Sequence, residues 1–173
     1  MSVAFTGVSE SVDTPGGGTD GRARAATGRR VVPTHAELAS WRSFLRAHAT
    51  ITKALEAELE TEQQLSLAAY DVLVQLSEAP GRRLRMTELA DAVLLSRSGV
   101  TRLVDRLERS GLVCRSRVAD DGRGVAAELT EDGLSRLRGA SVTHLRGIRA
   151  HFADALDESD LSALEKISRK LAP

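Results

Sequence analysis

The chain has 173 residues, of which 42% are hydrophobic and only 3% aromatic, and its 24 basic side chains balance 24 acidic ones. This length suffices for one domain with a sizeable core, and an apolar content drawn mostly from leucine, valine and alanine favours helices. No apolar run approaches the roughly 18 residues of a membrane span, no secretory signal is recognisable, and a single cysteine excludes an intrachain disulfide. We therefore expect a cytoplasmic protein without a membrane partner.

The balanced total charge conceals a local excess of basic residues. Residues 82–123 carry ten basic and six acidic side chains, whereas residues 34–81 carry three basic and seven acidic ones. Binding to phosphate requires a local basic face, whatever the total charge of the protein. The sequence therefore places a candidate nucleic-acid surface within residues 82–123.

Residues 1–33 have a composition of their own, with six glycines, many serines and threonines, and no helical or strand periodicity. Such a segment cannot bury enough apolar surface to offset the entropy lost on ordering, so we expect a disordered N-terminal arm. We interpret its arginines as part of a solvated tail, with DNA contact as the alternative: Arg22, Arg24, Arg29 and Arg30.

From Thr34 onward, apolar side chains recur at intervals of three and four residues, as is typical of an amphipathic helix. The stripe consists of Leu38, Trp41, Leu45, His48, Ile51, Leu55 and Leu59. The pattern predicts a helix of about 26 residues, roughly 39 Å long, within residues 34–62. Because a small domain cannot cover a helix of this length, we expect part of the stripe to contact a second subunit.

Two short helices are predicted next. Ser66 is the expected N-cap of the first, which ends at Pro80–Gly81. After an extended RRLRM segment, Thr87 is the expected N-cap of the second, with Glu88 and Asp91 in its first turn, where the helix dipole favours carboxylates. The side chains expected to face the core are Leu67, Tyr70, Leu73, Val74, Leu76, Met86, Leu89, Ala90 and Val93.

The next predicted helix, from Ser96 to Ser110, has two different faces. Its apolar stripe, expected in the core, consists of Val100, Leu103, Val104 and Leu107. The opposite face holds Ser98, Thr101, Arg102, Asp105 and Arg109, with Arg97 and Arg106 at its flanks. Small residues let a helix enter a groove about 12 Å wide, and arginine binds guanine or phosphate. We therefore predict a DNA-reading helix, whose Gly99 allows close approach.

After Gly111 the periodicity alternates, and a polar DDGRG turn separates two runs, which predicts a β-hairpin. The first run alternates Val113, Arg115 and Arg117 with Cys114, Ser116 and Val118, and the second contains Val125, Ala127 and Leu129. Arg123 at the tip is expected beside the minor groove, oriented by Asp120 or Asp121.

Two further helices are predicted, capped by Thr130 and Asp157. The apolar positions of the first are Leu134, Leu137, Leu145, Ile148 and Phe152, and those of the second are Leu161, Leu164, Ile167 and Leu171.

Residues 65–133 resemble the core of MarR-family transcriptional regulators. The resemblance is carried by MTELADAV, by SRSGVTRLVDRLERSGLV, and by Asp121-x-Arg123 followed by Leu129–Thr130. It implies a mainly α fold, with a winged helix-turn-helix and a small β-hairpin wing over residues 66–129. It also implies a homodimer formed by N- and C-terminal dimerisation helices, 34–62 and 130–173, which reads a pseudo-palindromic operator in double-stranded DNA. The expected DNA-contacting residues are Thr87, Ser96, Arg97, Ser98, Thr101, Arg102, Arg106, Asp121 and Arg123.

The resemblance further implies a repressor that is released when a small, often phenolic, molecule binds between the dimerisation helices and the winged lobe. Candidate lining residues are Trp41, His48 and Tyr70. For Trp41 and His48 we favour the alternative that they pack along the stripe of their own helix.

Two alternatives to a ligand-released regulator stay open. One is a winged-helix protein-interaction module, which the hydroxyl and arginine face of residues 96–110 disfavours. The other is a redox response through Cys114, although we favour a small buried hydrophobic role for this residue. We expect no enzyme, cofactor or metal, because no phosphate loop, paired catalytic carboxylates or nucleophile elbow is present and the four histidines lack metal-ligand spacing.

Overall fold

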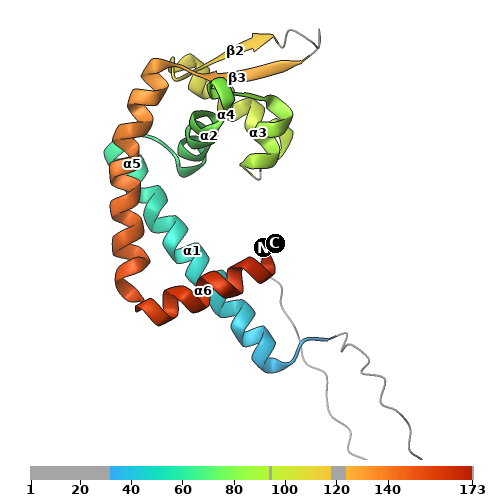
Figure 1. Ribbon diagram of the computed structural model, residues 1–173, viewed down its shortest axis with the longest axis vertical. Helices are drawn as coiled ribbons and strands as arrows, with labels where there is room; N and C mark the ends of the chain where they lie inside the picture. Colours follow the sequence, from blue (N-terminus) through green and yellow to red (C-terminus); the bar gives the residue numbers. More distant parts are fainter. Residues whose placement is uncertain (1–31, 94, 118–123, 173) are drawn as a thin grey trace, which may run out of the picture.

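The computed structural model describes residues 32–93, 95–117 and 124–172. The expected N-terminal arm lies almost wholly outside the described residues, as do Val118, Asp120, Asp121 and Arg123 of the wing. The remainder consists of a long-helix arm and a winged lobe at one end of it (Figure 1). The expected fold class, mainly helical with a small antiparallel sheet, is confirmed.

Helices α1 and α5 run side by side in the long-helix arm, and α6 crosses α1, with which it lines a shared groove (Figure 1). The elements of this arm are α1 (His35–Gln63), α5 (Glu131–His151), η2 (Ala153–Ala155) and α6 (Glu158–Leu171). The elements of the winged lobe are α2 (Leu67–Glu78), η1 (Pro80–Arg82), β1 (Arg83–Arg85), α3 (Met86–Ala92), α4 (Arg97–Arg109), β2 (Val113–Arg117) and β3 (Val125–Leu129). None of the helices in these described ranges combines the length and apolar character needed to cross a membrane.

Most helix starts lie where the sequence predicts them. The side chains of Ser66, Ser96, Thr130 and Asp157 each accept a hydrogen bond from a backbone N–H in the first turn of the helix that follows. These bonds satisfy donors that a helix terminus otherwise leaves unpaired. The capping residues therefore fix where four of the helices begin.

The prediction that Thr87 caps α3 is wrong. The helix begins at Met86, and Arg85 is the N-cap, with its backbone N–H donating to Glu88 Oε2 at 2.9 Å. Strand β1 pairs with β3 as far as Arg85, so the backbone stays extended up to that residue and turns helical immediately afterwards. Thr87 is instead an exposed residue in the first turn of α3.

The predicted hairpin is confirmed, and a third strand completes a sheet of order β1-β3-β2. Strand β3 is central: Ala127 lies opposite Leu84 of β1 and opposite Arg115 of β2. The expected alternation fails at the start of β3, where Val125 is exposed and Ala126 is buried. Strand β1 reaches only as far as Ala126, so Val125 extends beyond the part of β3 that has neighbours on both sides.

The core lies between α2, α3, α4 and the sheet, and extends to the C-terminal end of α1 and to α5. The predicted stripe of α4 is confirmed, with Val100 and Val104 at 0% exposure. In α1, by contrast, only Leu55 and Leu59 of the stripe are buried, while Trp41 is 56% exposed. The N-terminal half of α1 therefore carries apolar surface that the described chain leaves uncovered.

Candidate nucleic-acid interface

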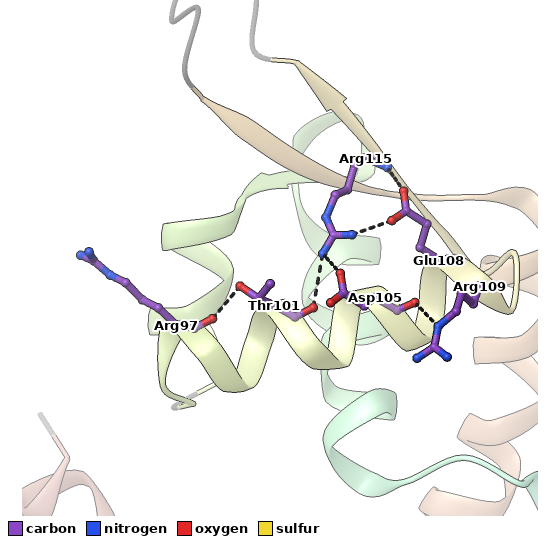
Figure 2. Close-up of polar contacts among 6 residues, drawn as sticks. All are labelled: Arg97, Thr101, Asp105, Glu108, Arg109 and Arg115. Atoms are coloured by element: carbon purple, nitrogen blue, oxygen red, sulfur yellow. Dashed lines mark hydrogen bonds and ion pairs between the residues drawn. The ribbon is translucent and has the colours of Figure 1, made fainter.

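Helix α4 presents its polar face to solvent because its apolar stripe is anchored in the core. The side chains exposed on it are those of Arg97, Ser98, Thr101, Arg102, Arg106 and Arg109. Thr101 Oγ1 donates to the carbonyl of Arg97 at 2.9 Å, whereas the Arg97 side chain extends away from the helix (Figure 2). This is the arrangement that the sequence predicts for a helix that enters a groove.

Three arginines of this face are free of intramolecular partners. Within the described part of the chain, the guanidinium groups of Arg97, Arg102 and Arg106 form no hydrogen bond or ion pair. Arg109 differs, because its Nε folds back onto the carbonyl of Asp105 at 3.1 Å. The donors of the first three arginines are therefore available to an external anion or to a base edge.

The N-terminal end of α4 is organised by the Ser96 hydroxyl. Ser96 Oγ accepts from Gly99 N at 3.1 Å and lies 3.3 Å from Ser98 Oγ. A Cβ atom on Gly99 would lie 3.1 Å from Ser96 Oγ, which is tighter than most real Cβ contacts. Gly99 therefore also makes room for the helix cap, in addition to the close approach to DNA that its residue type predicts.

An ion-pair cluster joins the wing to α4, and this cluster consists of Arg115, Asp105 and Glu108 (Figure 2). Arg115 Nη2 lies 2.6 Å from Asp105 Oδ1, and Arg115 Nη1 lies 2.6 Å from Glu108 Oε2. Arg115 Nη2 also donates to the carbonyl of Thr101 at 3.3 Å, and the Arg115 backbone N–H donates to Glu108 Oε1 at 3.2 Å. Asp105, predicted on the open face, is thus half-buried in an ion pair.

Two opposing effects act on the Arg115 guanidinium. Burial alone would lower its pKa, but hydrogen bonds to Asp105 and Glu108 outweigh burial and raise the pKa above its ordinary value. The group is therefore permanently charged. Sequence reasoning missed its role, although one signal was present: the alternation of β2 puts Arg115 on the same face as buried Val113, where a charged side chain requires a partner.

The three candidate ligand residues fall into two separate groups. The rings of Trp41 and His48 lie on either side of Phe44, with centroids 6.0 and 6.4 Å from that of Phe44. Tyr70 is buried, with its ring centroid 4.5 Å from that of His144. Packing of Trp41 and His48 along their own helix agrees with the alternative that the sequence favours, and a shared ligand site for all three residues stays a prediction.

A polar pair lies beside Tyr70, where α2 meets α5, and consists of the exposed Asp71 and the partly buried His144. Burial raises the pKa of Asp71 and lowers that of His144, and attraction between the two groups partly offsets both shifts. Glu56 adds to the rise at Asp71. His144 Nδ1 is buried without a hydrogen-bond partner among the described residues. Both groups therefore favour their neutral forms more than the same groups do in water.

A cavity of about 1070 Å³ separates α4 from the end of α1 and the start of α5. Its lining combines apolar side chains, among them Leu65 and Leu107, with charged residues of both signs, which are Arg106, Arg136, Glu60 and Asp132. Arg136 Nη2 also donates to the carbonyl of Gln63, which holds α5 to the end of α1. Arg106 therefore belongs both to this cavity and to the exposed face of α4.

The expectation that Cys114 is a small buried residue is wrong, because its side chain is exposed. Successive side chains of a strand point to opposite faces, and in β2 the core takes Val113. Cys114 therefore points away from the core and lies opposite Glu128 of β3.

Comparison with known proteins supports the resemblance noted in the sequence. Residues 63–124 match the profile of the MarR family. The transcriptional repressor YetL of Bacillus subtilis is 34% identical over 94 residues, which cover 54% of this chain and 56% of YetL. The chain thus spans little more than half the length of that relative.

Solved structures agree over a larger part of the chain. AbsC, a MarR family transcriptional regulator from Streptomyces coelicolor, is 36% identical with a TM-score of 0.75, and the match covers 83% of this chain and 96% of AbsC. Sco3205 from the same organism, solved in complex with DNA, is 34% identical with a TM-score of 0.77, covering 83% of this chain and 90% of Sco3205. The chain belongs to the MarR family of winged-helix transcriptional regulators.

Proposed function

We propose that this protein is a sequence-specific DNA-binding regulator that inserts α4 into the major groove. The observation that carries the proposal is the exposed row of Ser98, Thr101 and Arg102 above a fully buried stripe. The DNA complex of the similar protein Sco3205 supports it. Wing contacts by Asp121 and Arg123, and a contact by Thr87 from α3, stay predictions within this proposal.

Binding to the DNA upstream of the protein's own gene is expected to depend steeply on salt. A dimer that makes about 6–10 phosphate contacts loses a factor of roughly 10³–10⁵ in affinity between 50 and 200 mM salt, because each contact releases condensed counterions. Gel-shift titrations across this range measure the slope, with a random duplex of equal length as control. Absent or salt-insensitive binding would contradict the proposal.

We also propose that the protein is a homodimeric repressor. The support is the apolar surface left open on the long-helix arm, where a groove of about 580 Å³ lies between α1 and α6 and includes Phe44 and Leu161 in its lining. Both side chains are large and exposed, and an uncovered surface of this kind typically marks an interface. A second copy of the chain would bury it.

Replacing Leu161 with glutamate is expected to convert the dimer into a monomer, because a charge would then have to be buried inside the interface. Light scattering or sedimentation would report a mass near the 18.5 kDa of one chain instead of twice that value. Ser162→Glu is the matched control, since Ser162 is exposed on the same helix but does not line the groove. A wild-type protein that is itself monomeric would remove dimerisation from the proposal.

Release by a small aromatic ligand completes the proposed function. The cavity beside α4 supports it, because its apolar side chains suit an aromatic ring, and Arg106 and Arg136, which share the lining with Glu60 and Asp132, suit an acid group. A carboxylate bound by Arg106 would also withdraw this arginine from DNA. If no small aromatic acid changes both the thermal stability and the DNA affinity, this part of the proposal fails.

A further inference from the structure

The wing strand β2 and the groove-facing helix α4 are joined in the chain by Ser110, Gly111 and Leu112. Gly111 adopts a φ of +72°, in the left-handed region that favours glycine. Such a short connection fixes the distance between the two elements but leaves their relative angle to side-chain contacts. The contacts that set this angle decide how α4 and the wing meet the DNA together.

Arg115 supplies these contacts from the strand side. Its guanidinium bonds to Asp105, Glu108 and the carbonyl of Thr101, which lie on successive turns along α4. The second carboxylate oxygen of Glu108 accepts from the Arg115 backbone N–H, so this side chain binds both ends of the residue. Planar guanidinium groups can hold several acceptors at once in a fixed geometry, which a lysine ammonium cannot reproduce.

The Arg115 side chain is only 25% exposed, and its donors are directed at acceptors of its own chain. It cannot reach a phosphate without leaving two carboxylates unpaired. Arg115 therefore differs from the partner-free Arg102, although both are arginines within the same basic block. We propose that Arg115 is a positioning residue, which holds the wing and α4 at a fixed angle so that both fit one DNA site. This inference rests on the proposed DNA-binding function.

The cluster has an electrostatic consequence that the test must separate from positioning. One guanidinium faces two carboxylates, so loss of Arg115 leaves two negative charges beside Thr101, where they would repel DNA. The variants are therefore Arg115→Gln, in which only the arginine is lost, and a triple variant that adds Asp105→Asn and Glu108→Gln. The triple variant removes the unpaired charges without restoring the geometry.

Arg117→Gln is the matched control. Arg117 lies two residues further along β2 and is exposed, and only its carbonyl accepts a bond within the described residues, from Arg83 Nη2 at 2.7 Å. The substitution removes the same charge from the same strand and leaves the ion-pair cluster intact. Any effect that Arg115→Gln shares with Arg117→Gln is an effect of charge alone.

The first measurement compares affinity for the preferred site with affinity for random DNA. Positioning predicts that Arg115→Gln loses about tenfold or more at the preferred site. Positioning also predicts that the triple variant binds random DNA as well as the wild type does, while its affinity for the preferred site stays as low as that of Arg115→Gln. Recovery of wild-type affinity at the preferred site by the triple variant would overturn the inference, because charge alone would then explain the effect.

The second measurement needs no DNA. Cys114 is the single cysteine of the chain and is exposed on the face of β2 opposite Arg115, so a nitroxide attached there reports the motion of the strand. The spectrum is expected to show greater mobility in Arg115→Gln and in the triple variant, and no change in Arg117→Gln. Unchanged mobility in Arg115→Gln would overturn the inference.

These readouts distinguish a failure of the inference from a failure of the proposed function. A wild-type protein that binds no preferred site refutes the function, while the nitroxide spectrum still decides whether Arg115 holds β2 to α4. Thermal unfolding of each variant checks that it folds. If Arg115→Gln does not fold, Arg115→Lys takes its place. For this variant we expect a random-DNA affinity near that of the wild type, a reduced affinity for the preferred site and a more mobile nitroxide. A lysine variant with wild-type values in all three would overturn the inference.

Discussion

Replacing Gly133 with alanine is expected to destabilise the protein by about 2–3 kcal/mol, in the upper part of the roughly 1–3 kcal/mol that overpacking typically costs. A Cβ atom at this position would lie 2.0 Å from the backbone oxygen of Leu112 and 2.7 Å from Leu129 Cδ1. The Leu112 carbonyl is part of the backbone and cannot move aside without shifting the chain, and Leu129 is buried among other core side chains. Chemical or thermal unfolding measures the loss, with about 2–4 °C in Tm expected per kcal/mol for a chain of this size.

Gly139→Ala provides the matched control, since it is the same substitution in the same helix. Here the new Cβ meets only Gln63 Oε1, at an ordinary contact distance of 3.8 Å. Alanine also favours an exposed helix by up to about 1 kcal/mol over glycine. We therefore expect unchanged or slightly higher stability for this variant. Equal losses in the two variants would show that the contact at Leu112 is not the cause.

The close approach at Gly133 connects the two parts of the molecule. Thr130 N donates to the carbonyl of Leu112 at 3.2 Å, and Thr130 Oγ1 donates to the carbonyl of Gly111 at 2.7 Å. The first turn of α5 is thus attached to the connection between α4 and β2. A displacement of α5 would act directly on the connection from α4 to β2, so this junction offers a physical route from the long-helix arm to the DNA-facing surface.

The parts of this fold that depend on local chemistry could be predicted from the sequence. Ser66, Ser96 and Thr130 each precede an apolar run with helical spacing, and capping depends on residues within about four positions. The buried stripe of α4 follows from the same spacing, and with it the exposure of Thr101 and Arg102. The candidate DNA surface was therefore readable from residues 96–110 alone.

The errors arise where a contact between distant segments decides the outcome. Thr87 has the residue type of an N-cap, but the pairing of β1 with β3 ends at Arg85. The helix therefore begins at Met86, one residue before Thr87. Cys114 has the character of a core residue, but the register of β2 gives the inward position to Val113. Arg115 belongs to the basic block by residue type, and the alternation of β2 indicates that it needs a partner, but the packing of β2 on α4 decides that Asp105 and Glu108 are the partners.

Replacing Arg102 with alanine is expected to weaken binding to the preferred site by about 1–3 kcal/mol, or about 5- to 150-fold, while binding to random DNA barely changes. Arg102 is exposed on α4 and its guanidinium has no partner among the described residues, so its donors are free to bind the edge of a guanine. The same freedom means that folding stability should change by less than about 0.5 kcal/mol. Gel-shift titrations on both DNAs, together with thermal unfolding, measure these quantities.

Arg138→Ala is the control for loss of charge, because Arg138 is exposed on α5, outside the winged lobe. A change in net charge alone would reduce affinity for both DNAs, and by the same factor in the two variants. If Arg102→Ala loses affinity equally on preferred and random DNA, and Arg138→Ala loses none, Arg102 binds phosphate. Specificity would then lie elsewhere on α4. A selective loss on the preferred site is the result that requires a base contact, since phosphate carries no sequence information.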